Sequence, residues 1–221
     1  MTQRIIDLSY PIHEGMPTFP VPWQPVVEIT QLGRHGIEDR ESRRIVMGTH
    51  TGTHMDAPLH FIPRGGPIDK VPLELLIGPA RMVDFSNAKS KQEFGVKDFQ
   101  RVLGRDRPKR LVMRFDWSRH WGTIKYYQKQ PYISEEAAEW LIKQGVRLLA
   151  MDTAQADSPD NGRNAPKDSP VHKIMLGQGC YFLEYLTNLH EVQHMNFEMI
   201  VLPLKLLDAD GAPARCIAIE P

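Results

Sequence analysis

Four side chains that can bind metals or move protons lie within one short stretch, "MGTHTGTHMDAPLHF", residues 47–61. They are His50, His54, Asp56 and His60. Imidazole and carboxylate groups are ligands that Zn²⁺ takes in catalytic sites, and Mn²⁺ and Fe²⁺ also accept them. A single histidine of this kind is most often a surface or turn residue. Four such groups this close together, with glycine and proline between them, indicate a site.

Regular secondary structure cannot bring the first three of these groups to one ion. On a helix His50 and His54 share a face, but Asp56 points away from it. On a straight strand His50 and Asp56 would lie about 20 Å apart, at about 3.3 Å per residue. A sharp bend is therefore predicted between His50 and His54, where Gly52 stands. His60 is then left over as a nearby proton shuttle, because an unperturbed imidazole titrates near neutral pH.

The segment "HTGTHMDAPLHF" resembles the HxGTHxDxPxHF signature of the cyclase-type metal-dependent hydrolases, which include bacterial kynurenine formamidase and isatin hydrolase. The resemblance extends to "DLSYPI", "LLAMDTAQAD" and "LPLKL", and so covers most of the chain. It implies that His50, His54 and Asp56 are metal ligands and that His60 is the catalytic acid/base. It also implies a homodimer or larger homo-oligomer.

A second half of the site is expected far downstream. Glu184 is a carboxylate within the apolar run "CYFLEYL", and a buried carboxylate needs a partner or a metal. The family pattern adds a histidine and a glutamate, which His172 and Glu184 match. The resemblance implies that Asp56 and Glu184 bridge two metals, with His172 on the second. Mononuclear members exist, so the cofactor is predicted as one or two Zn²⁺ ions, with Mn²⁺ as the alternative.

These features predict a hydrolase that cleaves an amide, lactam or ester bond of a small, aromatic or cyclic substrate. A bound metal would lower the pKa of a coordinated water and so supply hydroxide at neutral pH, and His60 would accept and return a proton. Phe19 and Trp23 would form an apolar wall for a flat substrate. Their segment, "MPTFPVPW", departs from the "PxWPGD"-like segment of kynurenine formamidase, so the sequence does not identify the substrate. The polar loop 157–168 is expected to border the pocket.

Two alternatives remain open from the sequence. The segment "HEVQH", residues 190–194, matches HExxH, in which two helical histidines, here His190 and His194, bind the zinc of a protease. Only residues 195–221 follow, and they look like strands and offer no helix for a third ligand. The other alternative is a non-catalytic metal or small-ligand binding module on the same scaffold. His60 favours an enzyme, because a binding module does not need a spare base.

The elements that must position these groups are mostly short strands. The helix signals are strongest at 133–145, where Ser134 is a candidate N-cap and Gly145 a candidate C-terminal stop, and weaker at 95–103 and 169–176. Helices are too few for a doubly wound array, so the predicted fold is α/β (α+β-like) with a mixed β-sheet. The resemblance implies the cyclase-like swivelling β/α/β fold, and a single domain over 1–221 is expected. Strands are predicted at 4–10, 26–30, 43–48, 80–85, 110–116, 146–152, 180–186, 199–206 and 214–220.

Composition limits the choice of partners and location. The 27 basic and 27 acidic residues balance, so no charge excess draws the chain to nucleic acid or to a membrane surface. Cys180 and Cys216 are far apart and form no CxxC, which favours a reducing, cytoplasmic setting. We expect no signal peptide and no membrane span, because no apolar run approaches about 20 residues. The expected partner is a small-molecule substrate.

Overall fold

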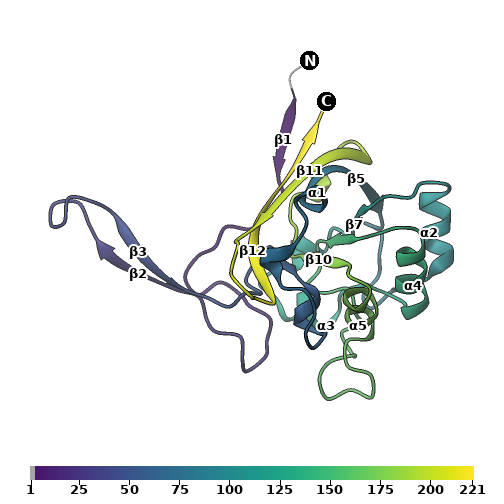
Figure 1. The fold of residues 1–221 in the computed structure, drawn as a ribbon, viewed down its shortest axis with the longest axis horizontal. Coiled ribbons are helices and arrows are strands. Elements are labelled where there is room, and N and C mark those ends of the chain that lie inside the picture. Colours follow the sequence, from purple (N-terminus) through teal and green to yellow (C-terminus); the bar gives the residue numbers. More distant parts are fainter. Residues whose placement is uncertain (1–2) are drawn as a thin grey trace.

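The computed structural model describes residues 3–221, and its centre is an eight-stranded mixed sheet (Figure 1). The strand order is β1-β12-β11-β5-β7-β9-β10-β4, and β12 also pairs with β4, which closes the sheet into a barrel-like form. These strands are β1 (Arg4–Asp7), β4 (His54–Asp56), β5 (Ile77–Asp84), β7 (Arg110–Arg114), β9 (Leu148–Met151), β10 (Tyr181–Glu184), β11 (Asn196–Pro203) and β12 (Gly211–Glu220).

The parallel strands β5, β7, β9 and β10 form the buried middle of the sheet. Alternate side chains of β9 enter different cores, Leu149 and Met151 on the helical side and Leu148 and Ala150 on the other. Burial on both faces explains why such strands appear in the sequence as continuous apolar runs. Glu184 at the end of β10 is a carboxylate within this buried layer, and only 4% of it is exposed.

Helices cover one face of the parallel strands. They are α2 (Val96–Leu103), α4 (Glu135–Lys143) and α5 (Pro170–Gly177), and Figure 1 shows α2 and α4 side by side. The hydroxyl of Ser134 accepts the N–H of Ala137 at 3.1 Å, so it caps α4 as predicted. Gly145 has a φ of +96° just beyond the helix, the conformation that glycine adopts most easily at such a stop.

Several short elements have no clear signal in the sequence. They are α1 (Leu73–Leu76), α3 (Ile124–Gln128), the paired strands β6 (Glu93–Phe94) and β8 (Tyr132–Ile133), and the 3₁₀ helices η1 (Pro58–His60), η2 (Ile68–Lys70), η3 (Trp117–His120) and η4 (Leu189–Glu191). Strand β4, with only three residues, was also not predicted. The prediction of a mixed sheet with few helices is confirmed, as are the helices predicted at 95–103, 133–145 and 169–176.

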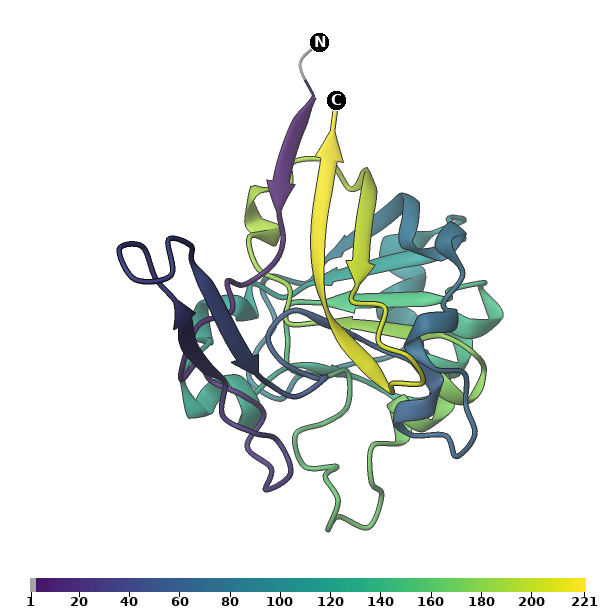
Figure 2. The ribbon, with the colours of Figure 1, turned by 60° about the vertical axis from the view of Figure 1, so that its left-hand side comes forward.

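A two-stranded arm projects from the body of the protein (Figures 1 and 2). It consists of β2 (Glu28–Gly33) and β3 (Ser42–Val46), which pair only with each other. The segment before the arm, residues 11–25, contains no helix or strand, as its prolines predict. Within residues 3–221, no helix combines the length and the apolar character needed to cross a bilayer.

Asp152, directly after β9, is a buried carboxylate that organises the neighbouring loop. Its two oxygens accept the backbone N–H groups of Phe115 and Trp117, each at 2.9 Å. Burial raises the pKa of Asp152 to about 7, despite these hydrogen bonds. The folded protein therefore holds this proton more tightly than the unfolded chain, where the pKa of an aspartate is about 3.9.

We expect Asp152 to make the free energy of unfolding decrease as the pH rises from about 4 through about 7, where its folded pKa lies. The sign follows because the folded state binds more protons in this range. Urea denaturation at several pH values should show a flatter pH dependence for Asp152→Asn. The exposed Asp160→Asn variant should keep the original slope. Equal slopes for Asp152→Asn and the unaltered protein would contradict the assignment.

Candidate metal centre

The chain turns sharply at Gly52, between the first two predicted ligands. Gly52 has a φ of +59°, and its carbonyl accepts the Nδ1–H of His54 at 2.8 Å. Strand β4 then runs antiparallel to β10, with His54 opposite Glu184 and Asp56 opposite Phe182. The predicted bend is confirmed. The pairing of two short, buried strands is what brings Asp56 and Glu184 together from distant parts of the chain.

Two histidines and two carboxylates form a buried cluster at this strand pair. His54 Nε2 lies 3.2 Å from Asp56 Oδ1 and 3.7 Å from Glu184 Oε2. His172 Nε2, from α5, lies 3.3 Å from Glu184 Oε1 and 3.6 Å from Asp56 Oδ2. All four side chains are at most 5% exposed. The ligand atoms of His54, Asp56 and Glu184 all lie within 4.8 Å of one another, close enough for one ion.

The rings of these two histidines are held so that Nε2 faces the carboxylates. His172 Nδ1 lies 2.5 Å from Oδ2 of Asp157, and His54 Nδ1 donates to the carbonyl of Gly52. Asp157 also accepts the N–H of Val171 at 2.7 Å, and so anchors the first turn of α5. A ligand histidine commonly donates its other N–H to a carboxylate or a backbone carbonyl, which fixes the tautomer.

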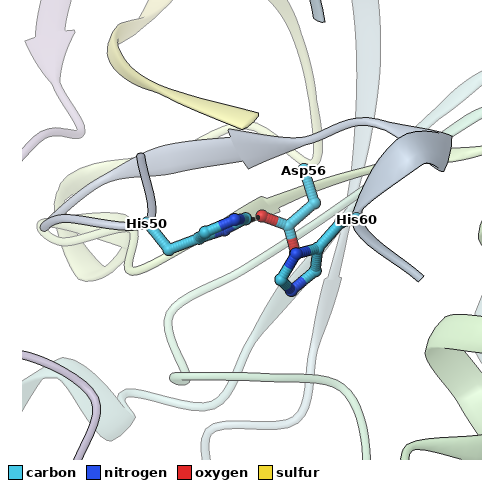
Figure 3. Close-up of side chains that lie close together, drawn as sticks. All are labelled: His50, Asp56 and His60. Carbon is cyan, nitrogen blue, oxygen red and sulfur yellow. Dashed lines mark hydrogen bonds and ion pairs between the residues drawn. The ribbon is translucent and has the colours of Figure 1, made fainter. Parts of the chain in front are cut away.

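His50 and His60 meet at a carboxylate that sequence reasoning missed, Asp210. Oδ2 of Asp210 lies 2.7 Å from His50 Nε2 and 3.1 Å from His60 Nδ1. On its other side His50 Nδ1 lies 2.7 Å from Asp56 Oδ1. In Figure 3 the side chains of His50, Asp56 and His60 point toward one another, and their ligand atoms lie within 4.8 Å. Asp56 therefore belongs to both groups of potential ligands.

The charges in the cluster depend strongly on one another. Burial disfavours charge on His50, but Asp56 and Asp210 outweigh it and raise the pKa of His50 to about 10. Burial would raise the pKa of Asp56, but the imidazoles of His50 and His60 hold it well below its usual range. Burial and the charge of Asp56 raise the pKa of Glu184. Two adjacent buried carboxylates require positive charge beside them.

A cavity of about 590 Å³ opens above the cluster. Phe19 and Tyr127 form one wall, with ring centroids 5.8 Å apart and planes at 87°. Trp23 and residues of the loop 157–168 also border the cavity. His50, His54, Asp56, His60, His172 and Glu184 all line it. The structure thus brings every residue that the family resemblance assigns to the site to one cavity, together with Phe19 and Trp23.

Comparisons with known proteins agree with this architecture. The family described as "Putative cyclase" matches residues 6–158. The chain belongs to the cyclase family. A kynurenine formamidase from Bacillus cytotoxicus is 34% identical over 216 residues, covering 96% of this chain and 95% of that protein. A kynurenine formamidase from Geobacillus thermodenitrificans is 31% identical over 210 residues, covering 95% and 94%.

Several solved structures show the same fold. Isatin hydrolase A from Labrenzia aggregata, bound to benzyl benzoate, has a TM-score of 0.88 and 26% identity, and the match covers 98% of this chain and 93% of that one. A structure described as a potential metal-dependent hydrolase with cyclase activity has a TM-score of 0.80 and 26% identity, with both chains fully covered. The prediction of a cyclase-like fold is confirmed.

The alternative of an HExxH zinc protease is wrong for this cyclase-family protein. His190 lies in the 3₁₀ turn η4, and no helix continues to His194. Both side chains are exposed, and the backbone N–H of His194 donates to Glu220 at 2.7 Å. The two histidines therefore do not share a helical face that could hold a zinc ion. Cys180 is a buried thiol whose pKa burial raises to about 12, so it is no nucleophile.

Asp157 and Asp210 are the two site residues without a clear signal in the sequence. Asp157 is the first residue of the polar loop 157–168. This loop contains several acidic residues, and the sequence does not show which of them contacts a ligand histidine. Asp210 lies in "DADG", between β11 and β12, a composition that indicates only a turn. Asp157 contacts a histidine 15 positions away, and Asp210 contacts histidines at least 150 positions away. These contacts are visible only in the folded chain.

Proposed function

We propose that this protein is a metal-dependent hydrolase that cleaves a non-peptide C–N bond in a small aromatic or cyclic amide. The observation that carries the proposal is the meeting of Asp56 and Glu184 with His54 and His172 on the floor of an aromatic-walled cavity. Its relatives named kynurenine formamidase, and the isatin hydrolase structure, support this reaction class. The same chemistry would cleave the C–O bond of an ester or a lactone.

The donor atoms of the cluster fit a divalent cation. Glu184 Oε1 is buried and accepts no hydrogen bond within the described chain, although His172 Nε2 lies 3.3 Å from it, so this oxygen is free to bind a cation. Imidazole nitrogens and carboxylate oxygens suit Zn²⁺ first and Mn²⁺ as an alternative. His50, His54 and Asp56 would hold one ion and His172 a second, with Asp56 and Glu184 shared. A single ion would use ligands from the same set.

When bound, the metal supplies Lewis acidity toward the substrate carbonyl and activates water at neutral pH. His60 borders the cavity, and with Nδ1 donating to Asp210 its Nε2 carries the lone pair that accepts a proton. His60 takes this proton from the attacking water and returns it to the leaving nitrogen as the C–N bond breaks. Asp210 holds the imidazole in place through this hydrogen bond.

Phe19 and Trp23 would contact the substrate ring. Phe19 packs edge-on against Tyr127, which gives the cavity an aromatic wall. Gln24, next to Trp23, donates to the carbonyl of His50 at 2.8 Å, which joins the wall to the ligand loop. A flat substrate lying against this wall would therefore have its amide bond above His50 and His60.

Metal analysis tests the proposal directly. The purified protein should contain Zn²⁺ or Mn²⁺ by mass spectrometry, and His54→Ala should lose it while His13→Ala, an exposed histidine, should not. Circular dichroism would show that the His54→Ala variant is folded. Formanilide, N-formylkynurenine and isatin should then be hydrolysed in a metal-dependent way. A protein that binds metal but hydrolyses none of them would be a binding module, against the proposal.

We further propose that the protein is a homodimer or larger homo-oligomer held by the arm β2–β3. A lone hairpin is marginally stable in water, and exposed apolar patches mark interfaces. The same chain exposes a second apolar strip at the end of β11 and directly after it, so a second copy offers both surfaces to the first. The exposed residues are Val26, Leu32, Ile37, Ile45 and Val46 near or in the arm, and Leu202, Leu204, Leu206 and Leu207 in the strip.

Light scattering after size exclusion should report at least a dimer. Replacing Ile37 and Ile45 together by aspartate should shift the protein to monomers, because both side chains are more than half exposed in the single chain. Glu38→Lys changes charge on the same arm without removing apolar area, and should leave the assembly intact. A monomer at all concentrations for the unaltered protein would refute the proposal.

We also propose one domain over 1–221 and a cytoplasmic location. β1 and β12, from opposite ends of the chain, pair in one sheet, which supports a single domain. Cys180 and Cys216 are free and buried, as fits a reducing compartment.

A further inference from the structure

A cationic side chain stands at the aromatic wall of the cavity. Arg163 comes from the loop 157–168, and its Cζ atom lies 5.2 Å from the ring centroid of Trp23. Both residues line the cavity that contains His60. Trp23 is 58% exposed, which is unusual for so large an apolar ring. Its contact with a guanidinium group is a favourable cation–π interaction.

The loop that carries Arg163 is tied to the body of the protein at several points. Asp157 anchors its start to α5, as described above. Lys91 pairs with Asp160 at 2.6 Å, and the N–H of Ser169 donates to the carbonyl of Asn161 at 3.0 Å. Arg163 lies between these attachments. These attachments place the backbone of Arg163 at the cavity, and the cation–π contact with Trp23 positions its guanidinium.

A cation–π contact uses the positive charge of a guanidinium group and does not engage its N–H donors as hydrogen bonds. The N–H donors lie in its plane, so they stay available for two parallel hydrogen bonds to a carboxylate. Within residues 3–221, no carboxylate oxygen lies within 4.0 Å of the nitrogens of Arg163. Asp168, another lining residue, already pairs with Lys173 at 3.2 Å. Arg163 is thus a positioned cation without an anionic partner in the described chain.

We propose that Arg163, in cation–π contact with Trp23, binds an anionic substituent, a carboxylate, on the ring of the substrate. This inference rests on the proposed function and specifies its substrate class as an aromatic amide that carries a carboxylate. The ring would lie along the wall of Phe19 and Trp23. The carboxylate would then meet Arg163 while the amide lies above His60.

The experiment compares two substrates that differ only in this charge, formanilide and 4-formamidobenzoate. The unaltered protein should show a kcat/KM for the carboxylate that exceeds that for formanilide by about tenfold or more, the range of a charge-assisted hydrogen-bond pair. In Arg163→Gln this ratio should fall toward one, mainly through KM of the carboxylate. Arg163→Lys should give an intermediate ratio, because an ammonium group cannot bind a carboxylate in the same two-fold geometry.

Lys167→Gln is the matched control, since it removes the same charge from the same loop. Lys167 pairs with Glu135 on the outside of the protein and does not line the cavity. For Lys167→Gln, the ratio of kcat/KM for 4-formamidobenzoate to kcat/KM for formanilide should equal that of the unaltered protein. An equal drop in both variants would show a general effect of charge and would overturn the assignment to Arg163.

Equilibrium binding separates this inference from the proposed function. Benzoate binding, followed by tryptophan fluorescence or calorimetry, requires no turnover and should weaken about tenfold or more in Arg163→Gln. If neither amide is hydrolysed but benzoate binding depends on Arg163, the proposed function fails and the anion site stands. If formanilide and 4-formamidobenzoate are hydrolysed equally well by the unaltered protein, the anion site is refuted and the hydrolase stands.

Discussion

Replacing His60 by glutamine should lower kcat by about 10²–10⁴-fold while the metal content stays unchanged. Glutamine can still form a hydrogen bond to Asp210, which lies 3.1 Å from His60 Nδ1, but it cannot accept or release a proton at neutral pH. The loss should therefore appear in the chemical step, with little change in KM. Steady-state kinetics on formanilide and metal analysis of the same preparation would measure both quantities.

The metal measurement in this experiment separates two roles for His60. Its ligand atom lies within 4.8 Å of those of His50 and Asp56, so the geometry also allows His60 to bind an ion. A His60→Gln variant that loses metal would make His60 a ligand, and one that keeps both metal and rate would leave it without a role. His190→Gln is the control, because His190 is exposed and lies outside the cavity.

The sequence predicted the chemistry of the site better than its geometry. His50, His54 and Asp56 were recognisable because they are close in sequence and because Gly52 marks the bend between them. Glu184 was recognisable because a carboxylate is out of place in an apolar strand. What joins the two parts is the pairing of β4 with β10. A three-residue strand is too short to show the alternation that identifies a strand.

In the fold, too, the features set by neighbouring residues were predictable and the pairings between distant segments were not. Helix α4 follows from its N-cap, its first-turn acids and its terminal glycine, all of which act within the helix. The closure of the sheet through β12 and β4 depends on residues more than 150 positions apart, Pro213 opposite His54 for example. No pattern within either segment encodes that pairing. Asp210 comes to His50 and His60 through this closure, since it directly precedes β12.

Asp157 is the residue whose role depends most on the folded arrangement, and its replacement by asparagine should weaken metal binding about 10–100-fold. Its Oδ1 accepts the N–H of Val171, and its Oδ2 accepts the N–H of His172 and contacts Nδ1 of the His172 ring at 2.5 Å. Asparagine has a single side-chain oxygen, so it cannot accept both the N–H of Val171 and the Nδ1–H of His172. Because the amide oxygen can still accept the N–H of Val171, α5 should remain folded while the ring of His172 loses its fixed tautomer.

Competition with a chromophoric chelator would give the metal affinity of Asp157→Asn, and urea denaturation of the metal-free protein would give its stability. We expect the affinity to fall more than the loss of stability explains. Asp160→Asn is the matched control, because Asp160 lies in the same loop and pairs with Lys91 on the surface. If both variants bind metal as tightly as the unaltered protein, Asp157 does not orient His172 for a metal. If Asp157→Asn loses affinity only in proportion to its stability, its role is confined to capping α5.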